Sequence, residues 1–147
     1  RGSLVDGDIV SATPLGIVEL GDVCAHQRAL SLDLFRELGA WVTAADDNAT
    51  GAARRWYSTA CHRHAWHAQL WADRAPAIPP VDLDAAVADA SRTRLPDAPD
   101  ADAYRSLLGE MIADLDGLAH RADADLDPAT RRVITLVRRD LADLHDP

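Results

Sequence analysis

The sequence predicts an all-α protein, a four-helix bundle in which two helical hairpins are joined by a long crossover. Apolar residues recur at intervals of three and four along four long stretches, and no stretch alternates apolar and polar residues as a strand would. A region with five prolines, between residues 75 and 100, separates the second stretch from the third. Because a hairpin turn does not need that length, we expect this region to run along the bundle.

The chain is expected to form one domain. Its 147 residues, 48% of them hydrophobic, are enough to bury a substantial core. Residues 1–14 are expected to be an irregular lead-in, and their first three, Arg1-Gly2-Ser3, have the form of a remnant of a cleaved tag. Residues 15–147 should then make up the single helical bundle domain.

The first hairpin should extend from residue 15 to Arg74. Its first helix, over about 15–45, has a stripe of large apolar residues interrupted by one polar residue, Gln27. Asp46-Asp47-Asn48 has the composition of a turn, and its last residue or Thr50 can cap the second helix. The prolines that follow Arg74 end that helix, since proline cannot continue it.

The second hairpin follows the proline-rich crossover, which contains one short helical candidate over 83–91. A third helix is expected over about 101–124, with leucines, Tyr104 and Met111 as its inward stripe. Asp127-Pro128 then places a capping side chain directly before a proline at the first helical position. This pair is a specific signal for the start of the fourth helix.

The second helix carries two histidines that should point into the core. Positions 56, 60, 64, 67 and 71 share one helical face, which includes His64 and His67, whereas His62 and Arg63 fall on other faces and should be solvated. An inward histidine pair three residues apart is an arrangement that helical bundles use for metal ligands. Ordinary hydrogen bonds can also satisfy two buried imidazoles, so both possibilities stay open.

The stretch His64-Ala65-Trp66-His67 resembles the Glu-x-x-His motif of ferritin-like proteins, with histidine in place of glutamate, and the order of hairpins and crossover resembles that superfamily. On this resemblance the chain is a divergent bacterial ferritin-like protein near the tRNA-hydroxylase-like branch. The resemblance implies two irons, held by a carboxylate on the first and third helices and by Glu-x-x-His on the second and fourth. Here the first helix has no inward acid, and Ala142 stands three residues before His145, so we expect no full di-iron centre.

A reduced site is still conceivable if the second and third helices are in register. It would consist of two histidines and two carboxylates, with a polar residue of the first helix on the fourth wall: His64, His67, Glu110, Asp140 and Gln27 or His26. Such a set would suit iron or another first-row divalent metal. Alternatively, the same side chains form a buried hydrogen-bonded network without a metal, and we favour this network.

We expect a non-catalytic ferritin-like scaffold that acts as a binding or regulatory protein, with a degenerate metal site and no cofactor. No nucleophile stands beside a plausible base, and the sequence has no glycine-rich phosphate loop and no cysteine pair at zinc spacing. The alternative is an iron-dependent oxidoreductase with the reduced site in the bundle core. A small-molecule ligand is compatible with either function.

The net charge of the chain indicates which partners it can bind. A net charge of −9 disfavours nucleic acid and anionic membranes, which need a basic surface. No apolar run is long enough to span a bilayer and no signal pattern opens the chain, so we expect a cytoplasmic protein.

The small residues of the second helix bear on self-association and on disulfide formation. A second face of small residues, which holds Cys61, Ala65, Ala68 and Ala72, predicts self-association as a homodimer, because exposed apolar faces usually meet a partner. In the predicted hairpin Cys61 lies level with about residue 33, too far from Cys24 for a disulfide. Both cysteines should therefore be free thiols.

Overall fold

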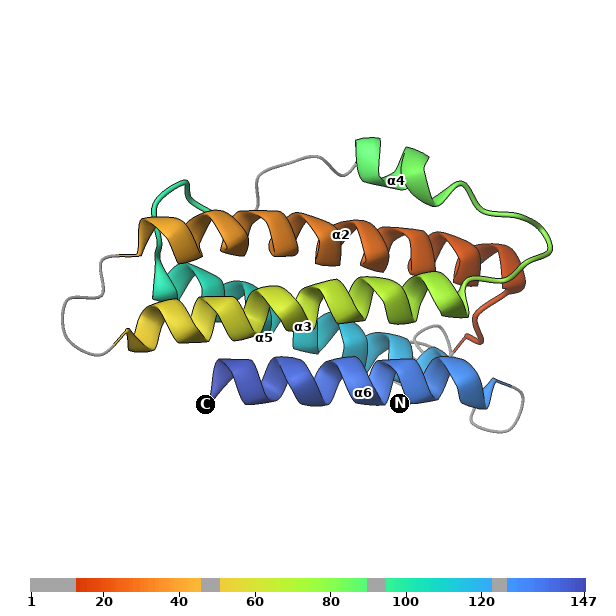
Figure 1. Ribbon diagram of the computed structural model, residues 1–147. Coiled ribbons are helices and arrows are strands. Elements are labelled where there is room, and N and C mark those ends of the chain that lie inside the picture. The colour runs from red at the N-terminus through yellow and green to blue at the C-terminus, as the bar shows by residue number, and fades with distance from the viewer. Residues whose placement is uncertain (1–12, 46–50, 90–94, 123–126) are drawn as a thin grey trace.

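The computed structural model describes residues 13–45, 51–89, 95–122 and 127–147 (Figure 1). Helices account for most of these residues, and no strand occurs among them. The long helices are α2 (Ile17–Ala44), α3 (Ala52–Arg74), α5 (Ala101–Arg121) and α6 (Pro128–His145), and a short helix, α4 (Leu83–Asp89), lies between α3 and α5. The predicted all-α class is confirmed. The expectations for residues 1–12, for the turn at 46–48 and for Thr50 as a cap lie outside the described residues.

Contacts at the two ends of α3 define the directions of the long helices. At the start of α3, Trp56 packs on Tyr104 near the start of α5, with 5.3 Å between ring centroids, so α3 and α5 run parallel. The Trp56 indole also donates to the carbonyl of Leu144 at the end of α6 (3.1 Å), while Arg74 at the end of α3 donates to Thr130 at the start of α6 (2.8 Å). Helices α3 and α6 are therefore antiparallel, as are the neighbours α2 and α3 (Figure 1).

The crossover runs along the outer face of α2. Near its beginning Val81 lies so close to Gly21 that a Cβ added to this glycine would come within 2.6 Å of the valine side chain. Near its end the carbonyl of Pro96 accepts a hydrogen bond from the Trp41 indole (3.0 Å). These contacts lie near opposite ends of α2, and α4 lies beside this helix between them (Figure 1). The proline-rich region thus returns the chain along the bundle before α5 begins, as its length predicted.

One core lies between the four long helices. Its largest members are almost fully buried: Leu34, Leu38, Trp41, Trp71, Tyr104, Leu108, Leu115 and Leu141. These residues occupy the inward stripes that the periodicity predicted. Trp66 is 54% exposed, because it lies outside the face that contains Ala60, His64 and His67.

The helix termini follow local chemistry in two cases and differ from prediction in a third. Asp127 accepts a hydrogen bond from the Thr130 amide (3.1 Å), with Pro128 at the first helical position, as predicted. Asp100 caps α5 in the same way. At the start of α3 the capping position is Gly51, with φ +65° in the left-handed region, which glycine adopts without the steric cost of a Cβ. The sequence predicted a capping side chain there, one or more residues earlier.

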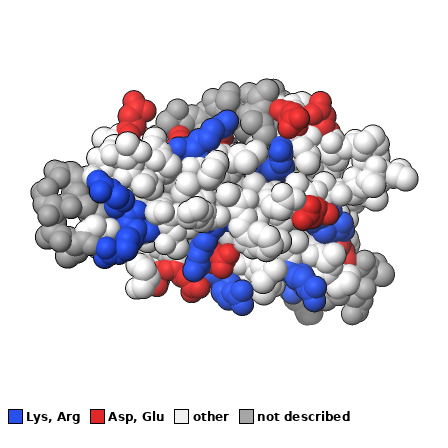
Figure 2. Space-filling view, in the orientation of Figure 1, with Lys and Arg blue, Asp and Glu red and all other residues white. Residues whose placement is uncertain are grey.

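Charged side chains of both signs are scattered over the surface in Figure 2, apart from one group of arginines at the end where α3 begins. Arg54 in this region donates to the carbonyls of Val42 and Ala45, which are among the last residues of the α2 segment (3.1 and 2.7 Å). These carbonyls have no partner within the helix, so a cationic donor beside them is favourable. The chain as a whole carries a net charge of −9, so a local group of arginines stands out against an acidic surface.

Candidate functional site

Two fully buried histidines lie in the middle of α3. His64 and His67 each have 0% exposure, which confirms that they point inward. Their ring centroids are 5.7 Å apart, and the ring planes are nearly perpendicular, at 84°. Three residues bring the helix close to one full turn, which is why both rings enter the same side of the bundle.

Each imidazole is held by a different helix. His64 Nε2 is hydrogen-bonded to the hydroxyl of Tyr104 on α5 at 2.7 Å, and His67 Nε2 to Asp140 Oδ2 on α6 at 2.9 Å. The structure therefore brings His67 and Asp140 together, as the sequence suggested. The role of Tyr104 was missed, because its place in an apolar stripe explained it as core; the signal was its hydroxyl, which needs a partner when buried.

Burial keeps both imidazoles neutral near pH 7. Burial, together with the smaller effect of the neighbouring His67, lowers the pKa of His64 to about 3. Burial also lowers the pKa of His67, although the hydrogen bond to Asp140 opposes the change. A carboxylate only accepts hydrogen bonds, so His67 Nε2 carries the hydrogen and its Nδ1 is a bare acceptor. Burial raises the pKa of Tyr104, so its phenol stays protonated.

The second nitrogen of each ring is unsatisfied. His64 Nδ1 and His67 Nδ1 are both buried and have no hydrogen-bond partner among the described residues. An unpaired buried nitrogen costs stability, and such groups are uncommon in folded proteins. Within this pair of histidines, these two atoms could accept a donor or bind a metal ion.

The other predicted ligands lie elsewhere. Glu110 is exposed on α5. His26 and Gln27 line a separate hollow of about 530 Å³ beside Asp114 of α5, and no residue of α3 contributes to its lining. Over the residues that the structure describes, no three His, Cys, Asp or Glu side chains form a group able to hold a metal. The proposed ligand set of His64, His67, Glu110 and Asp140 stays a prediction, of which the structure joins only part.

The register of the first hairpin explains why the first helix does not supply the fourth wall. Cys61 Sγ donates to the carbonyl of Phe35 at 3.2 Å, whereas the sequence placed Cys61 level with about residue 33. A shift of this size moves Gln27 away from the level of His67. Gln27 lines the hollow beside Asp114 of α5 instead.

Arg63 differs from its predicted solvated position. It is half-buried, and its Nη1 atom lies 3.5 Å from Asp140 Oδ1 and 3.7 Å from Asp143 Oδ2. The long side chain of arginine lets the charged group reach partners on a neighbouring helix while the stem lies along the surface. A polar chain therefore connects buried His67 through Asp140 and Arg63 to Asp143 at the surface.

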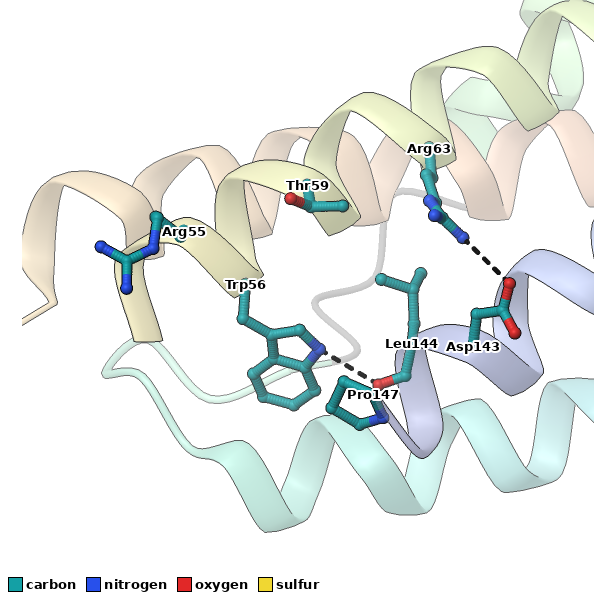
Figure 3. A pocket seen from close by; sticks show the side chains of 7 residues that line it. All are labelled: Arg55, Trp56, Thr59, Arg63, Asp143, Leu144 and Pro147. Atoms are coloured by element: carbon teal, nitrogen blue, oxygen red, sulfur yellow. Dashed lines mark hydrogen bonds and ion pairs between the residues drawn. The ribbon is translucent and has the colours of Figure 1, made fainter. Parts of the chain in front are cut away.

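This chain ends at a hollow of about 300 Å³ between α3 and the end of α6 (Figure 3). Its lining combines two arginines, one aspartate, one hydroxyl and apolar side chains: Arg55, Trp56, Thr59, Arg63, Asp143, Leu144 and Pro147. The volume is at the lower end of the range for sites that bind small molecules. A ligand in this hollow would contact Arg63 directly and His67 only through Asp140.

Both cysteines are free, as predicted. Cys24 is fully buried, and this burial raises the pKa of its thiol to about 11. Burial also raises the pKa of Cys61. Because the thiolate is the nucleophile, neither side chain has the properties of a reactive cysteine.

Comparison with known proteins adds no family assignment: no family model, curated protein or solved structure matches this chain. Among the described residues, no helix combines the length and apolar character that crossing a membrane requires. The function has to be inferred from the geometry of the two neighbouring features, the buried histidines and the hollow.

Proposed function

We propose that this protein is a non-catalytic helical scaffold with the ferritin-like order of helices, and that it acts by binding a ligand or partner. The parallel directions of α3 and α5 and the crossover along α2 support this order of helices. In this proposal His64 and His67 belong to a buried polar network. A cytoplasmic location, without nucleic acid or membrane as a partner, is part of the same proposal.

One observation carries the proposal: the two imidazoles are engaged in different directions. His64 Nε2 is bonded to Tyr104 of α5, His67 Nε2 to Asp140 of α6, and Glu110 points to solvent. A metal centre needs its ligand atoms aimed at one point. The residues therefore do not fit a pair of irons, which would need several carboxylates around them.

A single first-row metal is the second candidate, because both Nδ1 atoms are buried and find no partner in the part of the chain that the structure describes. A metal bound there would use His64 and His67 as ligands and would supply redox chemistry to an oxidoreductase. The chain's own contribution would be to orient the His67 ring through Asp140, as second partners of ligating histidines do. Measurement of the bound metal distinguishes this candidate from the first.

The test is elemental analysis of the purified protein, as isolated and after incubation with ferrous iron without oxygen. We expect less than stoichiometric metal in the parent and no difference in a His64→Ala, His67→Ala double variant. Glu110→Gln is the matched control, since this exposed carboxylate should affect neither metal content nor folding. Stoichiometric metal in the parent that disappears in the double variant, with helicity retained in circular dichroism, would overturn the scaffold proposal.

We also propose that the protein forms a homodimer through the surface of α2 and α3 that carries Phe35, Cys61, Ala65 and Trp66. Phe35 and Trp66 are 40% and 54% exposed on these helices, and Cys61 and Ala65 are partly exposed. Ala68, which the sequence assigned to this face, is buried in the core instead. Sedimentation velocity at micromolar concentration should show a dimer that Trp66→Ser weakens.

Ile78→Ser is the control for the dimer, because Ile78 is 81% exposed but lies in the crossover. The same loss of dimer in both variants would indicate general surface hydrophobicity instead of a specific face. A parent that sediments only as a monomer would remove the homodimer from the proposal.

A further inference from the structure

Arginines are concentrated at one end of α3 (Figure 2). Arg55 and Arg63 line the hollow beside the end of α6, and the guanidinium of Arg105 on α5 lies 4.7 Å from the centre of the Trp56 ring in the same wall. Asp143 also lines this hollow. The hollow thus places arginine side chains beside one aspartate, on a chain whose net charge is −9.

The lining residues of α3 occur at a regular spacing. Arg55, Thr59 and Arg63 are separated by four residues each, so they lie one above the other along a single face of the helix (Figure 3). At 1.5 Å of rise per residue, the two arginine backbones are about 12 Å apart, with the exposed Thr59 between them. This span matches one small molecule.

Arg63 retains the capacity to donate further hydrogen bonds. Its nearest carboxylate oxygens, on Asp140 and Asp143, are at 3.5 and 3.7 Å, well beyond the usual N–H···O distance of about 2.9 Å. A guanidinium presents five N–H groups in a planar fork that fits a carboxylate with two parallel bonds. An incoming carboxylate could therefore bind more closely than the aspartates that Arg63 now approaches.

The opposite part of the lining is apolar and held in place. The Trp56 indole donates to the carbonyl of Leu144 at 3.1 Å, and its ring packs against Tyr57 and Tyr104 at 5.4 and 5.3 Å. Trp56, Leu144 and Pro147 together give the hollow an apolar side next to its arginine side. A ligand that suits both sides has a planar apolar body and one anionic group.

We propose that this hollow binds a small aromatic carboxylic acid, with the carboxylate on Arg63 and Thr59 and the ring against Trp56. A flat aromatic carboxylate suits both the planar guanidinium of Arg63 and the apolar side of the hollow, whereas inorganic phosphate has no apolar part. The inference rests on the proposed role as a binding protein and names the class of its ligand. The small volume of about 300 Å³ argues for one molecule of modest size.

The test is titration of the full chain with sodium benzoate, followed by calorimetry and by the ¹⁵N–¹H signal of the Trp56 indole, assigned with Trp56→Phe. Three further probes serve as controls. Benzamide lacks the charge, acetate lacks the ring, and inorganic phosphate lacks the ring and carries more than one negative charge. We expect benzoate to bind with a dissociation constant of about 1 mM or lower, and each of the other probes to bind at least about tenfold more weakly.

Two variants test the location in different ways. Thr59→Phe fills the hollow from an exposed position without removing a charge, and Arg63→Gln removes the guanidinium. Each should weaken benzoate binding about tenfold or more, because Thr59→Phe removes the space for the ligand and Arg63→Gln removes its charged donor. Arg132→Gln, an exposed arginine at the other end of α6, should leave binding unchanged.

The proposal is overturned if the parent does not bind benzoate, if Thr59→Phe binds it as well as the parent does, or if phosphate binds more tightly than benzoate. Retained binding in Thr59→Phe counts against the hollow even if Arg63→Gln fails to fold. These outcomes are independent of the metal analysis. If the protein binds neither metal nor benzoate, the buried-network proposal stands and the ligand proposal fails. If it binds stoichiometric metal and also benzoate, the ligand proposal stands and the scaffold proposal fails.

Discussion

Helix α3 brings polar side chains into the bundle at two places, and their partners satisfy them to different degrees. At its C-terminal end Arg74 donates to Thr130 at 2.8 Å and to Asp127 at 2.9 Å, and Asp127 in turn accepts from the Thr130 amide. In its middle, His64 and His67 each use one nitrogen, and the other is buried with no partner within 13–45, 51–89, 95–122 and 127–147. One helix thus carries a satisfied polar cluster and an unsatisfied pair.

The pKa values follow this difference. Burial alone would raise the pKa of Asp127, but hydrogen bonds from Thr130 and Arg74 outweigh it and lower the pKa. For His64 burial dominates and lowers the pKa to about 3. The cluster at the end therefore stabilises the junction of α3 and α6, whereas the pair in the middle is held by the packing around it. Locally unfavourable polar groups of this kind are typical of functional positions.

The largest expected effect is the loss of a buried imidazole. His64→Ala should lower the free energy of unfolding by about 3–4 kcal/mol, because it leaves a cavity and an unpaired Tyr104 hydroxyl. Urea denaturation measures the change, with His62→Ala on the exposed face as a control that should stay within about 0.5 kcal/mol. A His64→Leu, Tyr104→Phe double variant should be more stable than His64→Leu alone, since it removes the Tyr104 hydroxyl that His64→Leu leaves unpaired. The opposite order would show that an unpaired Tyr104 hydroxyl costs no stability.

Stability should fall as the pH is lowered from 6.5 to 5. The folded pKa of His64 is about 3, below the ordinary value of 6.5, so the unfolded chain binds this proton first. Stability is therefore complete above pH 6.5 and is lost as the pH falls toward 3, by about 2 kcal/mol down to pH 5 from His64 alone. The lowered pKa of His67 acts in the same direction. Asp127, whose ordinary pKa is 3.8, does not titrate in this window.

Urea denaturation at several pH values gives the slope for this prediction. The His64→Leu, Tyr104→Phe variant should lose the part of the slope that belongs to His64, whereas His62→Gln should keep all of it. A flat profile between pH 6.5 and 5 would mean that water or a carboxylate stabilises the charged imidazoles in the folded state.

The cluster at the end of α3 should give a smaller effect that divides into two parts. Asp127→Ala removes a helix cap and an ion pair and should cost about 1–2 kcal/mol, while Asp127→Asn keeps the capping oxygen and should cost less. Asp100→Ala is the matched comparison, because Asp100 caps α5 by the same bond to the third residue on. Equal costs for both alanine variants, measured by thermal denaturation, would show that Arg74 adds nothing.

The smallest effect is expected at the surface. Arg138 pairs with Asp116 between α6 and α5, and both side chains are more than 40% exposed. Arg138→Gln should change the free energy of unfolding by less than about 0.5 kcal/mol, because solvent and salt screen such pairs. A larger loss would mean that even exposed charge pairs stabilise this bundle.

Much of the fold could be predicted because its signals are local. The four long helices, the start at Asp127-Pro128 and the inward direction of the histidines all follow from spacing along a single helix. The partners of the histidines depend on how helices sit against one another. Cys61 lies beside Phe35, about two residues from its predicted level, and this small offset accompanies the position of Gln27 in another groove.

The sequence by itself determined the helical class, the crossover and the residues that enter the core, because burial follows the periodic pattern of side chains. Only the tertiary structure decided that Tyr104 meets His64, that Arg63 reaches Asp140 and that Glu110 stays in solvent. The physical reason is that apolar packing tolerates small offsets between helices, whereas polar contacts do not. A hydrophobic stripe packs acceptably over a range of helix offsets, whereas a hydrogen bond or a metal ligand requires its partner within a few tenths of an ångström.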